Sequence, residues 1–137
     1  MQEEEVRLIM QQPFVSTASD GGTCVPDATV PHPRNYGCFP RKIGRYAIEM
    51  NIVPLATAIR SATGLPADIL QLPERGYLRP GDVADIVVFD PETFIDRATF
   101  EDQLHPPEGI AAVVVNGHIA VENGVLAPVP AGRLLLR

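Results

Sequence analysis

The stretch FVSTASDGG, residues 14–22, decides how the rest of the chain is interpreted. Residues 14–18 are typical of a short buried strand, which ends at Ser19, Asp20 and two glycines. α/β enzymes keep catalytic groups at the carboxyl ends of strands, and the glycines free the backbone there. Asp-Gly is also among the commonest turn dipeptides, so a plain turn is the alternative interpretation.

The composition is that of a globular protein with a core. Of the 137 residues, 45% are hydrophobic and 20% are charged. Eleven Lys and Arg against seventeen Asp and Glu give a net charge of −6, which argues against nucleic acid as a partner. No apolar run approaches the ~20 residues of a membrane span. Cys24 and Cys38 could pair, but nothing else in the sequence suggests secretion, so reduced thiols in a cytoplasmic protein are expected. The two cysteines lack a second Cys or His pair at zinc-finger spacing, which argues against a structural zinc site.

Helical patterns surround this stretch. Apolar side chains recur on one face of residues 3–12, which end at Pro13, and helical patterns return over 41–51, 55–63 and 65–70. Residues 19–41 are expected to form one long loop rich in Pro and Gly, of the kind that lines functional sites. The loop carries an arginine among prolines, which suits bidentate capture of a carboxylate; a solvated basic loop is the alternative.

Beyond residue 70 the pattern changes to short strands and turns. Strands are expected over 84–90, 111–115 and 118–121, with Asn116-Gly117 as a strong hairpin signal, and 134–136 as a candidate last strand. Residues 91–109 are expected to be a surface excursion. The chain thus divides into an α/β piece, 1–70, and a small β piece, 71–137. A single βα unit has no sheet to join, which is the first sign of a fragment.

Several motifs carry a resemblance to a known family. They are Ser19-Asp20-Gly21, His32-Pro33-Arg34, Tyr36-Gly37-Cys38-Phe39-Pro40-Arg41, Gly44-Arg45-Tyr46 and Asp96-Arg97-Ala98-Thr99-Phe100-Glu101. With these, the chain resembles the C-terminal part of the N-acyl-D-amino-acid deacylases (D-aminoacylases) of the amidohydrolase superfamily. The segments 75–81, 84–90 and 115–117 are similar to many amidohydrolases and indicate only the superfamily.

The resemblance implies a zinc-dependent hydrolase of N-acyl-D-amino acids on a (β/α)8 barrel. Residues 1–70 would be the C-terminal end of that barrel, incomplete here, and 71–137 a portion of a small β-sandwich. Asp20 matches the aspartate after the eighth strand, a catalytic acid/base and a candidate metal ligand. Arg34 would clamp the substrate's α-carboxylate, and His32 would shape the same substrate-binding loop. Cys38 stands where the family is expected to have threonine.

The other metal ligands of the superfamily have no match. The three histidines are His32, His105 and His118, and none belongs to a His-X-His pair on a strand. We therefore expect the chain to be inactive alone, with the rest of the barrel supplied by an upstream chain or a partner subunit. Two alternatives stay open: a dihydroorotase- or hydantoinase-like amidohydrolase, and a non-catalytic binding or assembly module.

Overall fold

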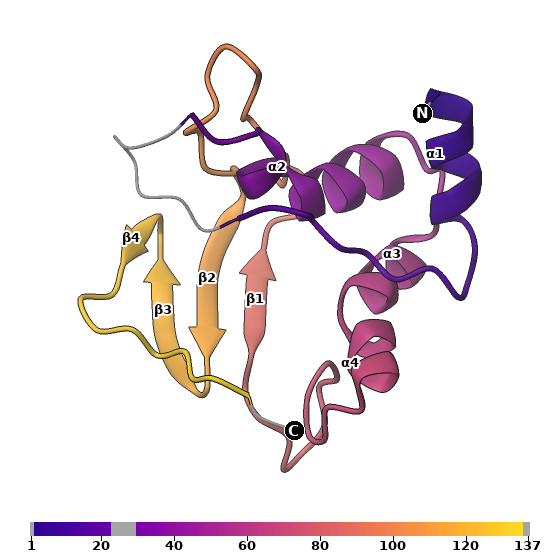
Figure 1. Ribbon diagram of the computed structural model, residues 1–137. Coiled ribbons are helices and arrows are strands. Elements are labelled where there is room, and N and C mark those ends of the chain that lie inside the picture. Colours follow the sequence, from indigo (N-terminus) through magenta and orange to yellow (C-terminus); the bar gives the residue numbers. More distant parts are fainter. Residues whose placement is uncertain (1, 23–29, 136–137) are drawn as a thin grey trace.

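The computed structural model of the protein describes residues 2–22 and 30–135, which form a group of helices beside an antiparallel sheet (Figure 1). The helices are α1 (Glu3–Met10), α2 (Arg34–Pro40), the π-helix η1 (Arg41–Glu49), α3 (Leu55–Ala62) and α4 (Gly64–Leu70). The strands are β1 (Ile86–Phe89), β2 (Ile110–Val115), β3 (His118–Glu122) and β4 (Val125–Leu126). None of the helices described is long and apolar enough to cross a membrane.

Helix α1 confirms the helix expected before Pro13. Its first turn carries three glutamates, which the positive end of the helix dipole favours. The side chains of Gln2 and Glu5 close a reciprocal capping box around that turn. Pro13 lacks the N–H that a continuing helix needs, so the helix ends at Met10.

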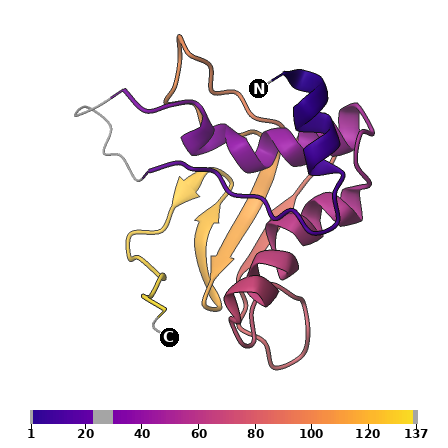
Figure 2. The ribbon, with the colours of Figure 1, turned by 45° about the vertical axis from the view of Figure 1, so that its right-hand side comes forward.

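The expected strand over residues 14–18 is wrong in this structure. The segment has no strand assignment and runs without regular structure from Pro13 to Gly22, alongside α2 (Figures 1 and 2). A strand exists only through its neighbours, because its hydrogen bonds run to other strands. The sheet of the described chain has the order β1-β2-β3-β4 and none of its strands pairs with this segment.

The expected loop over 19–41 is also wrong in its last part, because helix α2 begins at Arg34. Pro33 already has a helical φ of −51° and ψ of −27°, and proline is well suited to the position at which a helix starts. Helix α2 passes directly into the π-helix η1, so residues 34–49 form one continuous helical rod. The expected helix over 41–51 is therefore confirmed, with a longer N-terminal part.

The antiparallel sheet follows the predicted hairpins. Asn116 and Gly117 have φ values of 49° and 79°, as the two central residues of a type I′ turn require. This turn sets Val115 opposite His118 and brings β2 against β3. Asn123 and Gly124 repeat the same geometry and fold β4 back onto β3.

The last strand predicted over 134–136 is wrong for its described part. Leu134 and Leu135 have no strand assignment, and Leu136 lies outside the described residues. Strand β4 occupies this edge of the sheet instead, because the turn at residues 123–124 returns the chain to β3 at once.

The helical and sheet parts meet at a close contact between η1 and the chain after β1. A Cβ on Gly44 would overlap the carbonyl oxygen of Phe94, so only glycine allows this approach. Phe94 is buried and its ring lies 4.5 Å from that of Phe89 on β1. A small core gathers Ala47 of η1, Val53 and Ala58 of α3.

Candidate active site

Asp20 and Arg34, which the sequence proposed as acid/base and clamp, form an ion pair. Arg34 Nη2 lies 2.9 Å from Asp20 Oδ2. The Asp20 side chain is 87% exposed and that of Arg34 43%, so water screens the pair and it adds little stability. The pair's importance is therefore positional, because it joins two proposed functional groups that are fourteen positions apart in the sequence.

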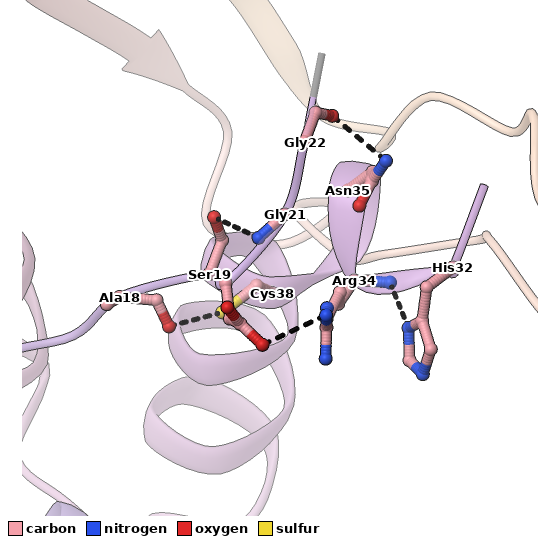
Figure 3. A network of polar contacts seen from close by, with 9 residues as sticks. Ala18, Ser19, Gly21, Gly22, His32, Arg34, Asn35 and Cys38 are labelled. Carbon is pink, nitrogen blue, oxygen red and sulfur yellow. Dashed lines mark hydrogen bonds and ion pairs between the residues drawn. The ribbon is translucent and has the colours of Figure 1, made fainter. Parts of the chain in front are cut away.

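The backbone around Asp20 is held in an unusual turn. Asp20 has a φ of 49°, a left-handed conformation that aspartate tolerates better than most residues. The N–H of Gly21 donates to Ser19 Oγ at 3.1 Å, and Asn35 Nδ2 donates to the carbonyl of Gly22 at 3.0 Å (Figure 3). The turn is therefore fixed to the first turn of α2, which begins with Arg34.

His32 acts on the start of the same helix. Its Nδ1 accepts a hydrogen bond from the backbone N–H of Arg34 at 3.1 Å, which satisfies one of the free N–H groups at the helix N-terminus (Figure 3). Its ring meets the edge of Phe100 with centroids 5.1 Å apart. This geometry supports a role in shaping the loop.

Cys38 ties the centre of α2 to the stretch before Asp20. Its Sγ donates to the carbonyl of Ala18 at 3.5 Å (Figure 3). Burial raises the pKa of the thiol, and the nearby cations Lys42 and Arg34 oppose that shift. Cys38 is therefore a half-buried thiol held against the stretch before Asp20. The other cysteine of the sequence, Cys24, lies outside the described residues.

An ion pair between Arg41 and Asp96 fastens the 91–109 excursion to the helical rod. Arg41 directs Nε and Nη2 to Asp96 Oδ2, at 2.8 and 2.7 Å. The Asp96 side chain is only 5% exposed, and a Cβ on Gly37 would lie 3.2 Å from it. The sequence marked Asp96 as part of a family motif but gave it no role.

The sequence also missed a buried lysine beneath the stretch 14–18. Lys42 is 8% exposed, and its Nζ donates to Thr17 Oγ1 at 2.6 Å and to Ser61 Oγ at 2.7 Å. Burial lowers the pKa of this amine. The helical pattern over 41–51 placed Lys42 among the polar positions. Its burial follows from the segment at Thr17 packing on η1, which no local pattern indicates.

A cavity of about 740 Å3 opens between these elements. Its walls come from α1, residues 15–19, the α2–η1 rod and residues 98–101 of the excursion. Arg34, Arg41 and Lys42 all line it. The cavity therefore brings three cations to a space bounded largely by apolar side chains.

The residues described here do not make a metal centre. No group of three or more His, Cys, Asp or Glu side chains converges anywhere in residues 2–22 and 30–135. His105 and His118 are both exposed, the first in the excursion and the second on β3. Asp20 is the candidate ligand from the sequence, and it has no partner ligands in this part of the chain.

Comparison with known proteins gives a consistent result. A family model described as "Amidohydrolase family" matches residues 4–121. The chain is 41% identical over 137 residues to D-aminoacylase of Alcaligenes xylosoxydans xylosoxydans, a match covering all of this chain and 28% of that protein. It is 43% identical over 117 residues to N-acyl-D-glutamate deacylase of the same organism, covering 85% of this chain and 23% of the relative.

Solved structures agree. A D-aminoacylase whose binuclear metal center was studied superposes with a TM-score of 0.92 at 42% identity, covering 100% of this chain and 28% of that one. An N-acyl-D-glutamate deacylase from Bordetella bronchiseptica, complexed with zinc and a phosphonate inhibitor, superposes with a TM-score of 0.82 at 42% identity. The match covers 91% of this chain and 26% of that one. The chain thus spans about a quarter of the length of the relatives it matches, between 23% and 28%.

Proposed function

Because this chain belongs to the amidohydrolase family, we propose that it is the C-terminal segment of a metal-dependent hydrolase that cleaves N-acyl-D-amino acids into a carboxylate and a free D-amino acid. The similar proteins are D-aminoacylases and N-acyl-D-glutamate deacylases, which favours this reaction over that of a cyclic amidase. In this proposal residues 1–70 form the C-terminal end of a (β/α)8 barrel, and residues 71–137 form a portion of a small β-sandwich.

The observation that carries the proposal is the short distance between Asp20 and Arg34. In an N-acyl amino acid, the amide nitrogen and the α-carboxylate are bonded to the same carbon. A group that transfers protons at the amide and a group that binds the carboxylate must therefore lie close together. Arg34 Nη2 and Asp20 Oδ2 are 2.9 Å apart, so a substrate that draws the guanidinium to its own carboxylate would release Asp20 beside the amide.

In this proposal Asp20 moves the proton. Its carboxylate accepts a proton from the attacking water and later donates one to the leaving amine. Arg34 holds the α-carboxylate through two parallel N–H donors, which a guanidinium presents and an ammonium does not. His32 keeps the first turn of α2 in place through its bond to the Arg34 N–H.

One similar structure is complexed with zinc, which supports zinc as the cofactor, and the described residues do not fit a complete zinc site. The ligands would have to come mainly from the missing part of the barrel, and no step is assigned to a metal in this chain. The alternative function, a non-catalytic binding or assembly module, is supported by the same observation that the described residues lack a set of metal ligands.

The experiment is a deacylation assay on the completed enzyme. The 137-residue segment should replace the matching segment of the Alcaligenes D-aminoacylase, and N-acetyl-D-leucine and N-acetyl-L-leucine should be offered separately. The chimera is expected to hydrolyse the D-isomer and to lose this activity with Asp20→Asn. A folded, metal-loaded chimera without D-selective hydrolysis would contradict the proposal.

A further inference from the structure

The excursion that follows β1 contains a tight turn around Phe100. Thr99 donates its N–H to the carbonyl of Asp102 at 2.8 Å. The hydroxyl oxygen of Thr99 in turn accepts the N–H groups of Glu101 at 3.2 Å and of Asp102 at 3.0 Å. These bonds fix the backbone on both sides of Phe100, so the turn presents the phenyl ring in a defined direction.

The turn is also attached to the helical rod. Ala98, which precedes the turn, is buried, with 2% of its surface exposed. Asp96 lies just before it and accepts two N–H groups of Arg41, at 2.8 and 2.7 Å. Phe100 is therefore carried on a segment whose place beside the rod is fixed at both of these points.

The ring of Phe100 meets the ring of His32. The two centroids lie 5.1 Å apart and the ring planes cross at 81°, which is an edge-to-face arrangement that aromatic pairs prefer. Phe100 is nevertheless 70% exposed, so it contributes little to the core of the described chain. The structural consequence of this phenylalanine therefore falls on His32.

The orientation of the His32 ring decides whether it can bond Arg34. Its Nδ1 accepts the backbone N–H of Arg34 at 3.1 Å (Figure 3). The accepting lone pair lies in the plane of the imidazole, so that plane has to stay directed at the N–H. Rotation about the last side-chain bond of a histidine is soft, and His32 is exposed, so burial does not fix its plane. The perpendicular contact with Phe100 does.

The hydrogen bond from Arg34 to His32 acts on the backbone from which the proposed clamp projects. Arg34 is the first residue of α2, where backbone N–H groups have no acceptor within the helix. An acceptor held firmly at this place fixes the Arg34 backbone. It thereby limits the directions in which the guanidinium, 2.9 Å from the carboxylate of Asp20, can reach.

We propose that Phe100 is a positioning residue of the carboxylate clamp, which holds the His32 ring and, through it, the direction of Arg34. The inference rests on the proposed function for the substrate's α-carboxylate, and on the contacts above for the residues. Phe100 lines the same cavity as Arg34 and His32, so direct contact with the substrate is the competing role. The two roles differ in which substrates and which second variants change the effect of removing the ring.

The test uses the chimera with N-acetyl-D-leucine and with N-isopentylacetamide, which has the same side chain but lacks the α-carboxylate. Phe100→Ala is expected to raise KM for the first substrate by about two- to tenfold, which is what an edge-to-face ring pair is worth, with kcat little changed. KM for the second substrate is expected to stay the same. Phe100→Tyr keeps the ring and should restore the wild-type KM.

Two further variants show whether Phe100 acts through His32. His32→Ala should raise KM at least as far as Phe100→Ala does. The double variant should be no worse than His32→Ala, because both changes interrupt one series of contacts. Leu104→Ala is the control and should leave KM unchanged, since Leu104 lies in the same excursion beyond the turn and is 43% exposed. The exposure of Phe100 means that its replacement leaves the core intact.

Each outcome bears on the positioning role. It is overturned by an unchanged KM for Phe100→Ala, by an equal penalty on both substrates, or by penalties of Phe100→Ala and His32→Ala that multiply. If the folded, metal-loaded chimera does not hydrolyse N-acetyl-D-leucine, its Kd for this compound, measured by calorimetry, replaces KM in the same comparison. Weaker binding by Phe100→Ala then supports the positioning role and counts against the proposed function. A folded chimera that does not bind the compound overturns the clamp together with its positioning residue.

Discussion

The carboxylate of Asp96 receives two N–H groups of Arg41, although the rest of η1, helices α3 and α4 and strand β1 lie between the two residues in the sequence. Asp96 is the enclosed partner, with 5% of its side chain exposed against 49% for Arg41. The pair joins the excursion after β1 to the rod that begins with Arg34. The position of the proposed clamp thus depends on a contact from the β part of the chain.

Asp96→Asn tests that dependence. The amide keeps the shape of the side chain but removes the charge from a buried, doubly hydrogen-bonded position. We expect a loss of about 1–3 kcal/mol in the free energy of unfolding, measured by urea denaturation. Asp82→Asn is the control, because the Asp82 side chain takes part in no ion pair among the described residues. Equal stability of the two variants would reduce the pair to a surface contact.

The buried Lys42 predicts a pH dependence of stability. Burial lowers its pKa in the folded state below the ordinary value of 10.5, so the unfolded chain holds this proton to higher pH than the folded chain does. Between the two pKa values the unfolded state binds more protons, and stability therefore rises with pH. Lys42→Met should lack this rise, because methionine has no group that titrates. The variant should still fold, because the hydroxyls of Thr17 and Ser61, 3.2 Å apart, can bond each other.

The measurement is the difference in unfolding free energy between wild type and Lys42→Met across the alkaline range. Taking the difference cancels most of the contribution of Cys38, whose raised pKa acts in the opposite direction by lowering stability as pH rises. A difference that stays constant up to pH 10.5 would show that Lys42 is not desolvated in solution.

The isolated chain should neither hydrolyse an N-acyl amino acid nor bind zinc tightly. Without three or more ligands, no metal-held water forms with a pKa lowered toward ~7. The described residues bring no such group together. Zinc titration by calorimetry and a deacylation assay on the 137-residue chain check both halves. Chelator-sensitive turnover by the pure chain, or stoichiometric tight binding, would contradict the fragment interpretation.

The sequence predicted best where a local rule decides the structure. The Asn116-Gly117 turn fixed a hairpin because few residues adopt φ values of 49° and 79° in succession. Helix α1 followed from its acidic first turn and from Pro13. The amidohydrolase family was predicted from the motifs at 19–21 and 32–34, and the family match over residues 4–121 confirms it.

Prediction failed where a structure depends on distant partners. Residues 14–18 have the composition of a buried strand, but the strands that would bury them are not among the described residues. Lys42 and Asp96 are buried by segments 25 and 55 positions away, at Thr17 and Arg41. No periodicity within a helix or a loop reports contacts over such separations. Asp20, Arg34 and His32 come together as the motifs suggested, and their catalytic roles stay predictions.

The last prediction concerns those roles in the completed deacylase. Asp20→Asn keeps the shape and hydrogen-bonding length of the side chain but removes the basic oxygen. If Asp20 transfers the proton, kcat should fall by about 10²–10⁴ with KM little changed. Arg34→Lys keeps the charge and loses the two-pronged guanidinium, so its penalty should appear mainly in KM. Steady-state kinetics of the chimera with N-acetyl-D-leucine measure both.

A second substrate isolates the partner of Arg34. An amide that lacks the α-carboxylate offers nothing for Arg34 to clamp, so Arg34→Lys should impose little further penalty on it. Arg45→Lys is the control, because Arg45 is exposed and lies on the same helical rod. Near-wild-type kcat for Asp20→Asn would remove its catalytic assignment. An equal penalty of Arg34→Lys on both substrates would mean that Arg34 does not bind the α-carboxylate. Its role would then be to order the turn at Asp20 through their ion pair of 2.9 Å.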